Sequence, residues 1–478
     1  MKHLYLILLI VVALNVKAER PAIVFEIADP LIKEARITTP VNGTYFPGTL
    51  LIMSLAETTG KLAINNELTA AGIMQVYAGK SYSFFIKPGK SYTIRLDPKN
   101  TQAPFTFTGE NSSGQYLLNQ IRHPNYQGKA AGYKINGTSF NDVKLSVNKD
   151  ADSERHQYTE LFKQKKIDEE FYKYALLDID YYYASVLSII IYDHKEEPGF
   201  ADAWPELFKT YNLQNAAATA SSSYYDYADQ YASWYQSYLR KKAGINKVYD
   251  MRKSNEYLLH WYNSYADNLT GKTQEYMLSR FLSQFMGMKK YETELVDLFK
   301  DFKKRYPASI YLTYLQPGAD EIIAYHARVD SNKGTESTIL TNYSNINTLS
   351  EILAQFKNRT LFVDLWATWC GPCKEEFTYS TDLKKYLKEK GADILYISTD
   401  LDERDKEWRA MITYYNLGGQ HIRASDKLRQ DLINVLWAGN KNYAIPRYLI
   451  IKNGQVVEKN ALRPSDKQKL YSQISKYL

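Results

Sequence analysis

The stretch VDLWATWCGPCKEEF, residues 363–377, holds both cysteines of this 478-residue chain. Cys370 and Cys373 are three positions apart, and the sequence has no other cysteine. A disulfide between them closes a loop too short to stabilise a fold much by restricting the unfolded chain. The seven histidines show no metal-ligand spacing near the pair. We therefore predict redox chemistry at this pair, with neither a metal nor a bound cofactor.

The residues around the pair indicate a junction between a strand and a helix. Residues 360–366 are typical of a buried strand, and residues 373–391 of a helix. Pro372 suits the first turn of that helix. Because unpaired N–H groups and the helix dipole stabilise a thiolate there, we expect Cys370 to be the exposed nucleophile. Cys373, one turn inside the helix, is expected to be more buried and to resolve the mixed disulfide.

The pattern after the motif is that of an alternating α/β unit. It predicts a buried strand, a helix and a hairpin with Asn453-Gly454 at its turn, over 393–400, 403–415 and 447–459. A final helix closes the chain. The polar stretch 328–345 is typical of a linker or a long entry loop. We therefore predict a C-terminal α/β domain over residues 340–478, with the cysteines at its first strand-to-helix junction.

These residues carry a family resemblance. WCGPC at such a junction resembles the thioredoxin fold, and VDLWATWCGPCKEE resembles the TlpA/ResA-like branch of exported bacterial thioredoxins. The resemblance covers residues 340–478. It implies a thiol–disulfide oxidoreductase that acts on protein disulfides through Cys370 and Cys373.

The resemblance extends to single positions around the motif. Asp364, six residues before Cys370, matches the buried carboxylate that takes the proton of the resolving cysteine in thioredoxins. Glu376 matches an acidic position that tunes the pair in ResA-like proteins, although a solvated helix residue fits that position equally well. The resemblance implies that Trp369 shields the site and shapes its contact surface.

A second segment matches the family pattern far along the chain. Ile445-Pro446 matches the dipeptide whose proline is cis and faces the disulfide in the family. The resemblance implies that Ile445 offers backbone groups to an extended substrate, beside Gly371 and Pro372 of the motif. Arg447 departs from the family, where a small polar residue is frequent at this position.

The N-terminus is typical of a secretory signal. A short basic start is followed by an apolar run over residues 4–16 and small residues up to Ala18. We predict a signal peptide over residues 1–18 and, with the family resemblance, a periplasmic location. An uncleaved anchor is the alternative.

Between the predicted signal peptide and the α/β domain, the sequence pattern changes once, from strand-like to helix-like. Residues 19–110 predict an antiparallel β domain, because β-branched and aromatic runs alternate with turn signals. Residues 111–330 predict a helical region. Within it, five tyrosines share one helical face, at positions 224, 227, 231, 235 and 238. They suit either a groove for an extended polypeptide or packing between helices, and packing is favoured.

The formal charge excludes one class of partner. It is +7, and removal of residues 1–18 with two lysines leaves 58 − 53 = +5. Lysine and arginine are mixed with acidic residues, so no nucleic-acid groove is expected.

The resulting hypothesis is an extracytoplasmic reductant of protein disulfides, recharged by a membrane electron-transfer partner. One alternative is a disulfide isomerase whose N-terminal region binds clients or dimerises. The other is a partner-binding redox sensor. The oligomeric state is not predictable from the sequence.

Overall fold

The computed structural model describes residues 22–32, 34–54, 60–121, 123–135, 137–245, 256–331, 336–440 and 443–478. The predicted signal peptide lies outside the described residues. The chain divides into two compact units. One comprises Met1–Asn246 and Ser264–Arg280, and the other comprises Lys247–Asn263 and Phe281–Leu478. The first contains the β-rich part and the earlier helices of the helical region, and the second contains its later helices and the C-terminal α/β domain.

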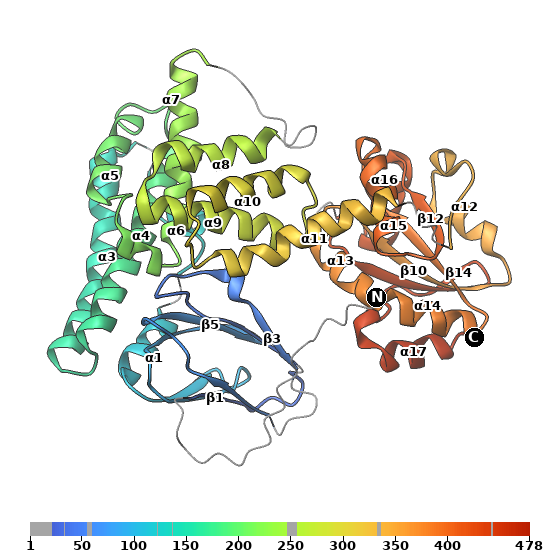
Figure 1. Ribbon diagram of the computed structural model, residues 1–478, viewed down its shortest axis with the longest axis horizontal. Helices are drawn as coiled ribbons and strands as arrows, with labels where there is room; N and C mark the ends of the chain where they lie inside the picture. The colour runs from blue at the N-terminus through green and yellow to red at the C-terminus, as the bar shows by residue number, and fades with distance from the viewer. Residues whose placement is uncertain are drawn as a thin grey trace. The chain divides into compact units, whose positions relative to one another are not determined.

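The β-rich part consists of two sheets that enclose one apolar core. The described strands of the first sheet run in the order β4 (Lys61–Asn65), β1 (Ala22–Ile27), β7 (Tyr92–Leu96) and β8 (Phe105–Thr108). Those of the second run in the order β3 (Leu51–Ser54), β2 (Glu34–Thr38), β5 (Gly72–Ala78) and β6 (Lys80–Ile86). The two sheets face each other (Figure 1). Alternate residues from both sheets form a single hydrophobic cluster, as expected of a sandwich.

The five-residue strands β2 and β4 have a weak strand signal in the sequence, because EARIT and KLAIN are short and contain only one or two β-branched residues and no aromatic residue. In addition, β1 pairs with β7 in parallel, so the expectation of an antiparallel domain is wrong for this pair. A parallel pair needs a long crossover, which the chain from β2 to β6 supplies.

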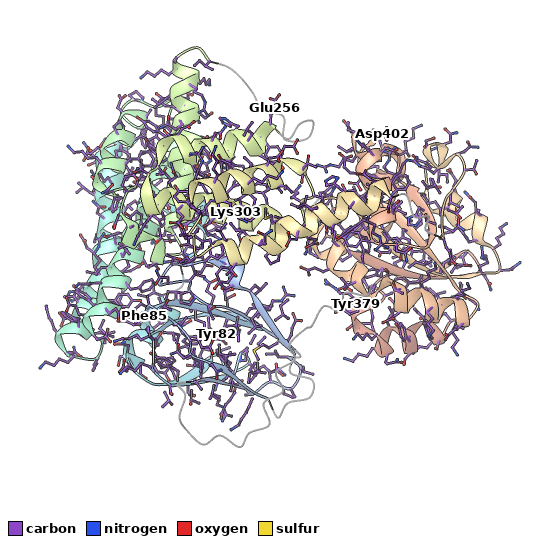
Figure 2. All side chains as sticks on the ribbon, in the orientation of Figure 1. Tyr82, Phe85, Glu256, Lys303, Tyr379 and Asp402 are labelled. Atoms are coloured by element: carbon purple, nitrogen blue, oxygen red, sulfur yellow. A yellow bond between two sulfur atoms is a disulfide. The ribbon has the colours of Figure 1, made fainter. Side chains whose placement is uncertain are left out.

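Helix α1 (Ser112–Gln120) covers the edge strand β6. The Gln115 side-chain amide accepts from the Phe85 N–H (3.0 Å) and donates to the Phe85 carbonyl (2.7 Å). Asn119, one turn later, makes the same pair of bonds with Ser83 at 2.9 and 2.7 Å. These amides replace a neighbouring strand and remove an exposed sheet edge. Figure 2 labels Phe85 and Tyr82, which belong to opposite faces of β6.

The helical region spans both units. Its longer helices are α3 (Phe140–Lys163), α4 (Glu169–Asp193), α8 (Glu256–Asn268), α9 (Gly271–Gly287), α10 (Thr293–Arg305) and α11 (Leu312–Asp330). Among the described residues, α4 alone has the length and apolar composition of a membrane-spanning helix. Because 78% of its apolar window is buried within the protein, α4 has the character of a core helix.

The tyrosine-rich segment confirms the packing interpretation. It forms α6 (Tyr224–Asp229), a π-helical stretch (Gln230–Tyr235) and α7 (Gln236–Lys242). The predicted tyrosine face packs on Phe208 and Trp204 of α5 (Trp204–Thr210) and on Tyr181 of α4. These rings are therefore part of the helix-to-helix core.

The C-terminal domain has the expected thioredoxin arrangement. Its described strands run in the order β14 (Gln455–Glu458), β13 (Arg447–Lys452), β10 (Thr360–Trp366), β11 (Asp393–Ser398), β12 (Gly419–Arg423) and β9 (Ser337–Ile339). Strands β10, β11, β12 and β9 are parallel, and β13 and β14 form the predicted antiparallel hairpin. Asn453 and Gly454 at its turn both have positive φ, as a tight hairpin turn requires.

Helices cover both faces of this sheet (Figure 1). Helices α12 (Leu349–Leu353) and α16 (Asp426–Trp437) share an apolar core with the odd-numbered residues of β10. Helices α13 (Gly371–Glu376), α14 (Ser380–Glu389) and α17 (Gln468–Ser475) lie on the other face, toward which the even-numbered residues of β10 point. Asp364 therefore points toward the face that carries the cysteines.

Strand β9 lies within residues 328–345, which the sequence predicts as a linker. Its three residues pair in parallel with β12. A strand this short, with polar neighbours, carries no periodicity from which it could be predicted. The sheet therefore begins before residue 340.

Candidate active site

The two cysteines form a disulfide at the N-terminus of α13. Cys370 is the N-cap residue, and Pro372 occupies the first helical turn, as predicted. The Cys370 Sγ accepts a hydrogen bond from the Cys373 backbone N–H at 3.2 Å. This N–H group and the positive end of the helix therefore both act on the Cys370 sulfur, and both favour a thiolate after reduction.

The predicted exposure of Cys370 is wrong for this disulfide-bonded state. Cys370 is 3% exposed and Cys373 is 0% exposed, so the predicted order holds but both residues are buried. The bond to Cys373 and the hydrogen bond from its N–H hold the Cys370 side chain back over the first turn of α13. The neighbouring Trp369 is 48% exposed, and apart from its chain neighbours and the backbone of α13, no described atom lies within 4 Å of a Cβ built on Gly371. The surface beside the disulfide is therefore open at these two residues.

Asp364 is buried in the middle of the sheet. It is 2% exposed, and its two cross-strand partners are Tyr396 on β11 and Tyr448 on β13. Its Oδ1 has no hydrogen-bond partner among the described residues. Burial raises the pKa of Asp364 well above its usual range, and the charge of Glu376 raises this pKa further. The carboxyl group is thus held in its neutral form at pH values where an exposed aspartate is ionised.

Glu376 ends α13 and is buried, so the alternative of a solvated helix residue is wrong. Its two carboxylate oxygens accept from the Ser465 N–H and the Ser465 hydroxyl, both at 2.9 Å. The Arg463 guanidinium lies 3.7 Å away. These partners compensate the buried charge. Glu376 therefore ties the C-terminal end of α13 to the segment before α17 and acts electrostatically on Asp364.

The Ile445-Pro446 peptide bond is cis. Ile445 packs in part against the apolar core of the domain. The Arg447 guanidinium lies over the Trp437 ring at 4.7 Å and donates to the Lys459 carbonyl at 3.1 Å. The long side chain that departs from the family pattern is thus fixed by its own contacts. The contribution of Ile445 and Pro446 to substrate binding stays a prediction.

Sequence reasoning missed Asp400, which anchors the loop before Cys370. This buried carboxylate accepts from the Thr368 N–H (2.8 Å) and from the hydroxyls of Thr368 and Ser398 (both 2.7 Å). Burial raises the pKa of Asp400, and these hydrogen bonds oppose that effect. In the sequence Asp400 is only a polar residue after a buried strand, so nothing there distinguishes it from a solvated strand end.

We predict that Thr368→Val destabilises the domain by about 1–3 kcal/mol, because the Asp400 carboxylate stays buried with one donor fewer. Valine keeps the shape of threonine, so lost packing contributes little. Urea denaturation of the full chain measures the effect, and Thr368→Ser, which keeps the hydroxyl, is the matched control. Equal stability of the valine variant and the natural protein would show that the anchor is not needed.

Comparisons with known proteins agree with this geometry. Residues 336–474 match the family model described as Redoxin. The thiol-disulfide oxidoreductase ResA of Bacillus thuringiensis is 36% identical over 107 residues, which are 22% of this chain and 57% of that protein. ResA of Bacillus subtilis is 37% identical over 46 residues, which are 10% of this chain and 26% of that protein. The chain thus spans between about a quarter and little more than half of the length of these two curated relatives.

Solved structures are similar to about a quarter of this chain. The thioredoxin domain of a thiol-disulfide oxidoreductase from Bacteroides vulgatus is 25% identical, with a TM-score of 0.22, over 26% of this chain and 83% of that one. A thiol:disulfide interchange protein from Bacteroides sp. is 26% identical, with a TM-score of 0.21, over 26% of this chain and 75% of that one.

Sheet topology, the position of the disulfide and the sequence matches together define the C-terminal part as a thioredoxin-fold domain. More particularly, the sequence of this domain is similar to that of the thiol-disulfide oxidoreductase ResA from several bacilli.

Proposed function

We propose that this chain is an extracytoplasmic thiol–disulfide oxidoreductase that reduces disulfides of protein substrates through Cys370 and Cys373. The observation that carries the proposal is the disulfide at the start of α13, where the Cys373 N–H donates to the Cys370 Sγ. The positive potential at the helix N-terminus stabilises a thiolate at this sulfur. Similarity to ResA supports the same reaction class.

The reaction follows from the roles of the two sulfurs. The Cys370 thiolate attacks one sulfur of a substrate disulfide, forms a mixed disulfide and releases the other substrate sulfur as a thiolate. Cys373 then loses its proton, and its sulfur attacks the Cys370 Sγ. This second attack releases the remaining substrate sulfur and forms the Cys370–Cys373 disulfide. Two electrons pass to the substrate, and the two sulfurs carry them without a bound cofactor.

Asp364 is the proposed acceptor for the proton of Cys373. A proton transfers efficiently when donor and acceptor have similar pKa values. Burial raises the pKa of this carboxyl group from the usual aspartate range toward that of a thiol. Glu376 supports this role, because its charge raises the pKa of Asp364 further.

The proposed substrate surface joins the motif to the cis-proline segment. Trp369 is half exposed, and Gly371 leaves room for a polypeptide to approach the sulfurs. We propose that Ile445 and Pro446 contribute backbone groups to the same surface, which suits the addition of an extended peptide. Pro372 completes the surface by holding the first turn of α13.

The proposed location outside the cytoplasm rests on the signal-like N-terminus and the exported relatives implied by the family resemblance. A reductant in an oxidising compartment must be re-reduced, so we propose a membrane electron-transfer protein as its partner.

Reduction of insulin disulfides by the purified full chain, with dithiothreitol as electron source, tests the proposal. The expected result is that the insulin B chain precipitates much earlier with the protein present than in a sample that contains dithiothreitol alone. Equal rates with and without the protein would contradict it.

A further inference from the structure

Lys374, the residue after Cys373, is a buried lysine that the reaction described above does not use. It is 2% exposed, and its Nζ donates to the carbonyl of Lys289 at 2.8 Å. Its own backbone N–H donates to the Cys370 carbonyl at 3.3 Å, so Lys374 belongs to the turn that carries the disulfide. Lysine is almost never fully buried unless it is paired, and this ammonium has a carbonyl rather than a carboxylate as its partner.

The residues that cover Lys374 come from outside the thioredoxin fold but belong to the same compact unit. Lys289 follows α9 and adopts a left-handed backbone conformation with φ of 54°, which places its carbonyl in the turn before α10. The Tyr291 ring centroid lies 5.5 Å from the Lys374 Nζ. Residues 288–292, named here the α9–α10 turn, therefore seal this side of α13.

Tyrosine contacts hold the α9–α10 turn in place. The Tyr291 ring stacks on Tyr325 of α11 at 4.3 Å and 2°, and its hydroxyl lies 2.5 Å from the Tyr415 hydroxyl. The Tyr291 hydroxyl also donates to Glu321 at 3.0 Å. Tyr415 in turn contacts Phe377, the residue after α13, at 5.1 Å. The turn is thus connected to both the first turn and the C-terminal end of the active-site helix.

The groups around Lys374 have opposite effects on its pKa. Burial is the main cause that lowers the pKa of Lys374, to about 7, and Lys290 and Arg404 lower it further. Glu292 and Asp400 act in the opposite direction. The ammonium and amine forms of Lys374 are therefore both populated near neutral pH.

We infer that Lys374 is a positioning residue through which the α9–α10 turn sets the reduction potential of the Cys370–Cys373 couple. The inference rests on the proposed function and gives the helical region a part in it. Reduction adds two electrons to the disulfide and leaves a thiolate at Cys370 and a thiol at Cys373, with the uptake of one proton. An ammonium on the same turn stabilises that thiolate, whereas the neutral disulfide gains nothing from it.

The coupling works in both directions. If the contact between the α9–α10 turn and Lys374 favours the reduced couple, reduction strengthens that contact by the same factor. A partner that displaces Lys289 or Tyr291 would therefore shift the couple toward the disulfide. Through this contact the helical region can control when the active site holds electrons.

The test is Lys374→Met in the full chain, which removes the charge and keeps a side chain of similar length. The equilibrium constant with glutathione is measured by trapping thiols across the neutral range. We expect a shift toward the disulfide of about threefold to tenfold near pH 6, where tenfold corresponds to about 30 mV. The shift should shrink above pH 8, where the natural Lys374 is itself neutral.

Two further variants separate the outcomes. Lys384→Met is the matched control. It removes the ion pair that Lys384 of α14 makes with Glu336, and it should leave the equilibrium constant unchanged. Tyr291→Phe leaves Lys374 intact but removes the hydroxyl contacts of the turn, and it should shift the couple in the same direction by a smaller factor. Unchanged equilibrium constants and pH profiles in folded Lys374→Met and Tyr291→Phe would overturn the inference. Failure of the proposed function is distinct, since the natural protein would then not reduce insulin at any pH.

Discussion

Replacing Cys370 with serine is expected to lower insulin reduction to the rate of dithiothreitol alone. The first step requires a sulfur that attacks from the N-terminus of α13, and a serine hydroxyl is not ionised there near neutral pH. Cys373→Ser should also abolish turnover, but for another reason. The first attack still occurs, and in the absence of dithiothreitol the mixed disulfide between Cys370 and the substrate then accumulates, because the variant has no second sulfur to resolve it.

Mass spectrometry of the trapped species separates these two results. The Cys373→Ser variant should carry one substrate chain through Cys370, and the Cys370→Ser variant should carry none. Both variants should give urea-denaturation curves close to that of the reduced natural protein, since the disulfide between residues three positions apart adds little stability. Turnover by Cys370→Ser, or adducts mainly at Cys373, would contradict the assignment of the nucleophile.

Asp364→Asn is expected to make the protein more stable and less active. The natural carboxyl group is buried with one oxygen that lacks a partner among the described residues. The amide removes the cost of burying an ionisable group, so the free energy of unfolding near pH 8 should rise by about 1–3 kcal/mol. Without a proton acceptor for Cys373, turnover should fall by about a hundredfold or more.

The pH dependence of this stabilisation has a definite sign. Because the folded-state pKa of Asp364 is raised, the unfolded chain releases this proton first as pH rises. Stability of the natural protein therefore falls from the usual aspartate pKa upward, and the asparagine variant lacks this contribution. The advantage of the variant should be small near pH 4 and grow toward pH 8. Equal advantage at both pH values, or full activity of the variant, would exclude the proposed proton exchange.

The motif made much of this site predictable. The spacing of the cysteines, the strand before them and Pro372 were sufficient to place the disulfide at the start of a helix. The family resemblance predicted a buried carboxyl group at Asp364, and the apolar strand around this residue supported that prediction. Local sequence is informative here because each of these features depends on neighbours within a few residues.

Other features depend on contacts between distant segments. Lys374 would be taken for a solvated helix residue, but the α9–α10 turn, far back in the chain, covers its ammonium group. Asp400 acquires its partners from Thr368, which the pairing of β10 with β11 brings close. The sequence could not decide between a tuning role and a solvated position for Glu376, because its partner Ser465 is 89 residues away. Strand β9 is too short to carry a periodicity and exists because β12 offers it an edge.

The reduction potential of the Cys370–Cys373 couple in the full chain tests the central claim most directly. Equilibration with a dithiol buffer, followed by trapping and mass spectrometry, gives the value. A reductant of protein disulfides should have a potential near that of thioredoxin, at about −270 mV. A potential of about −180 mV or higher, where protein disulfide isomerase lies, would contradict the claim, because such a couple gives up its disulfide readily.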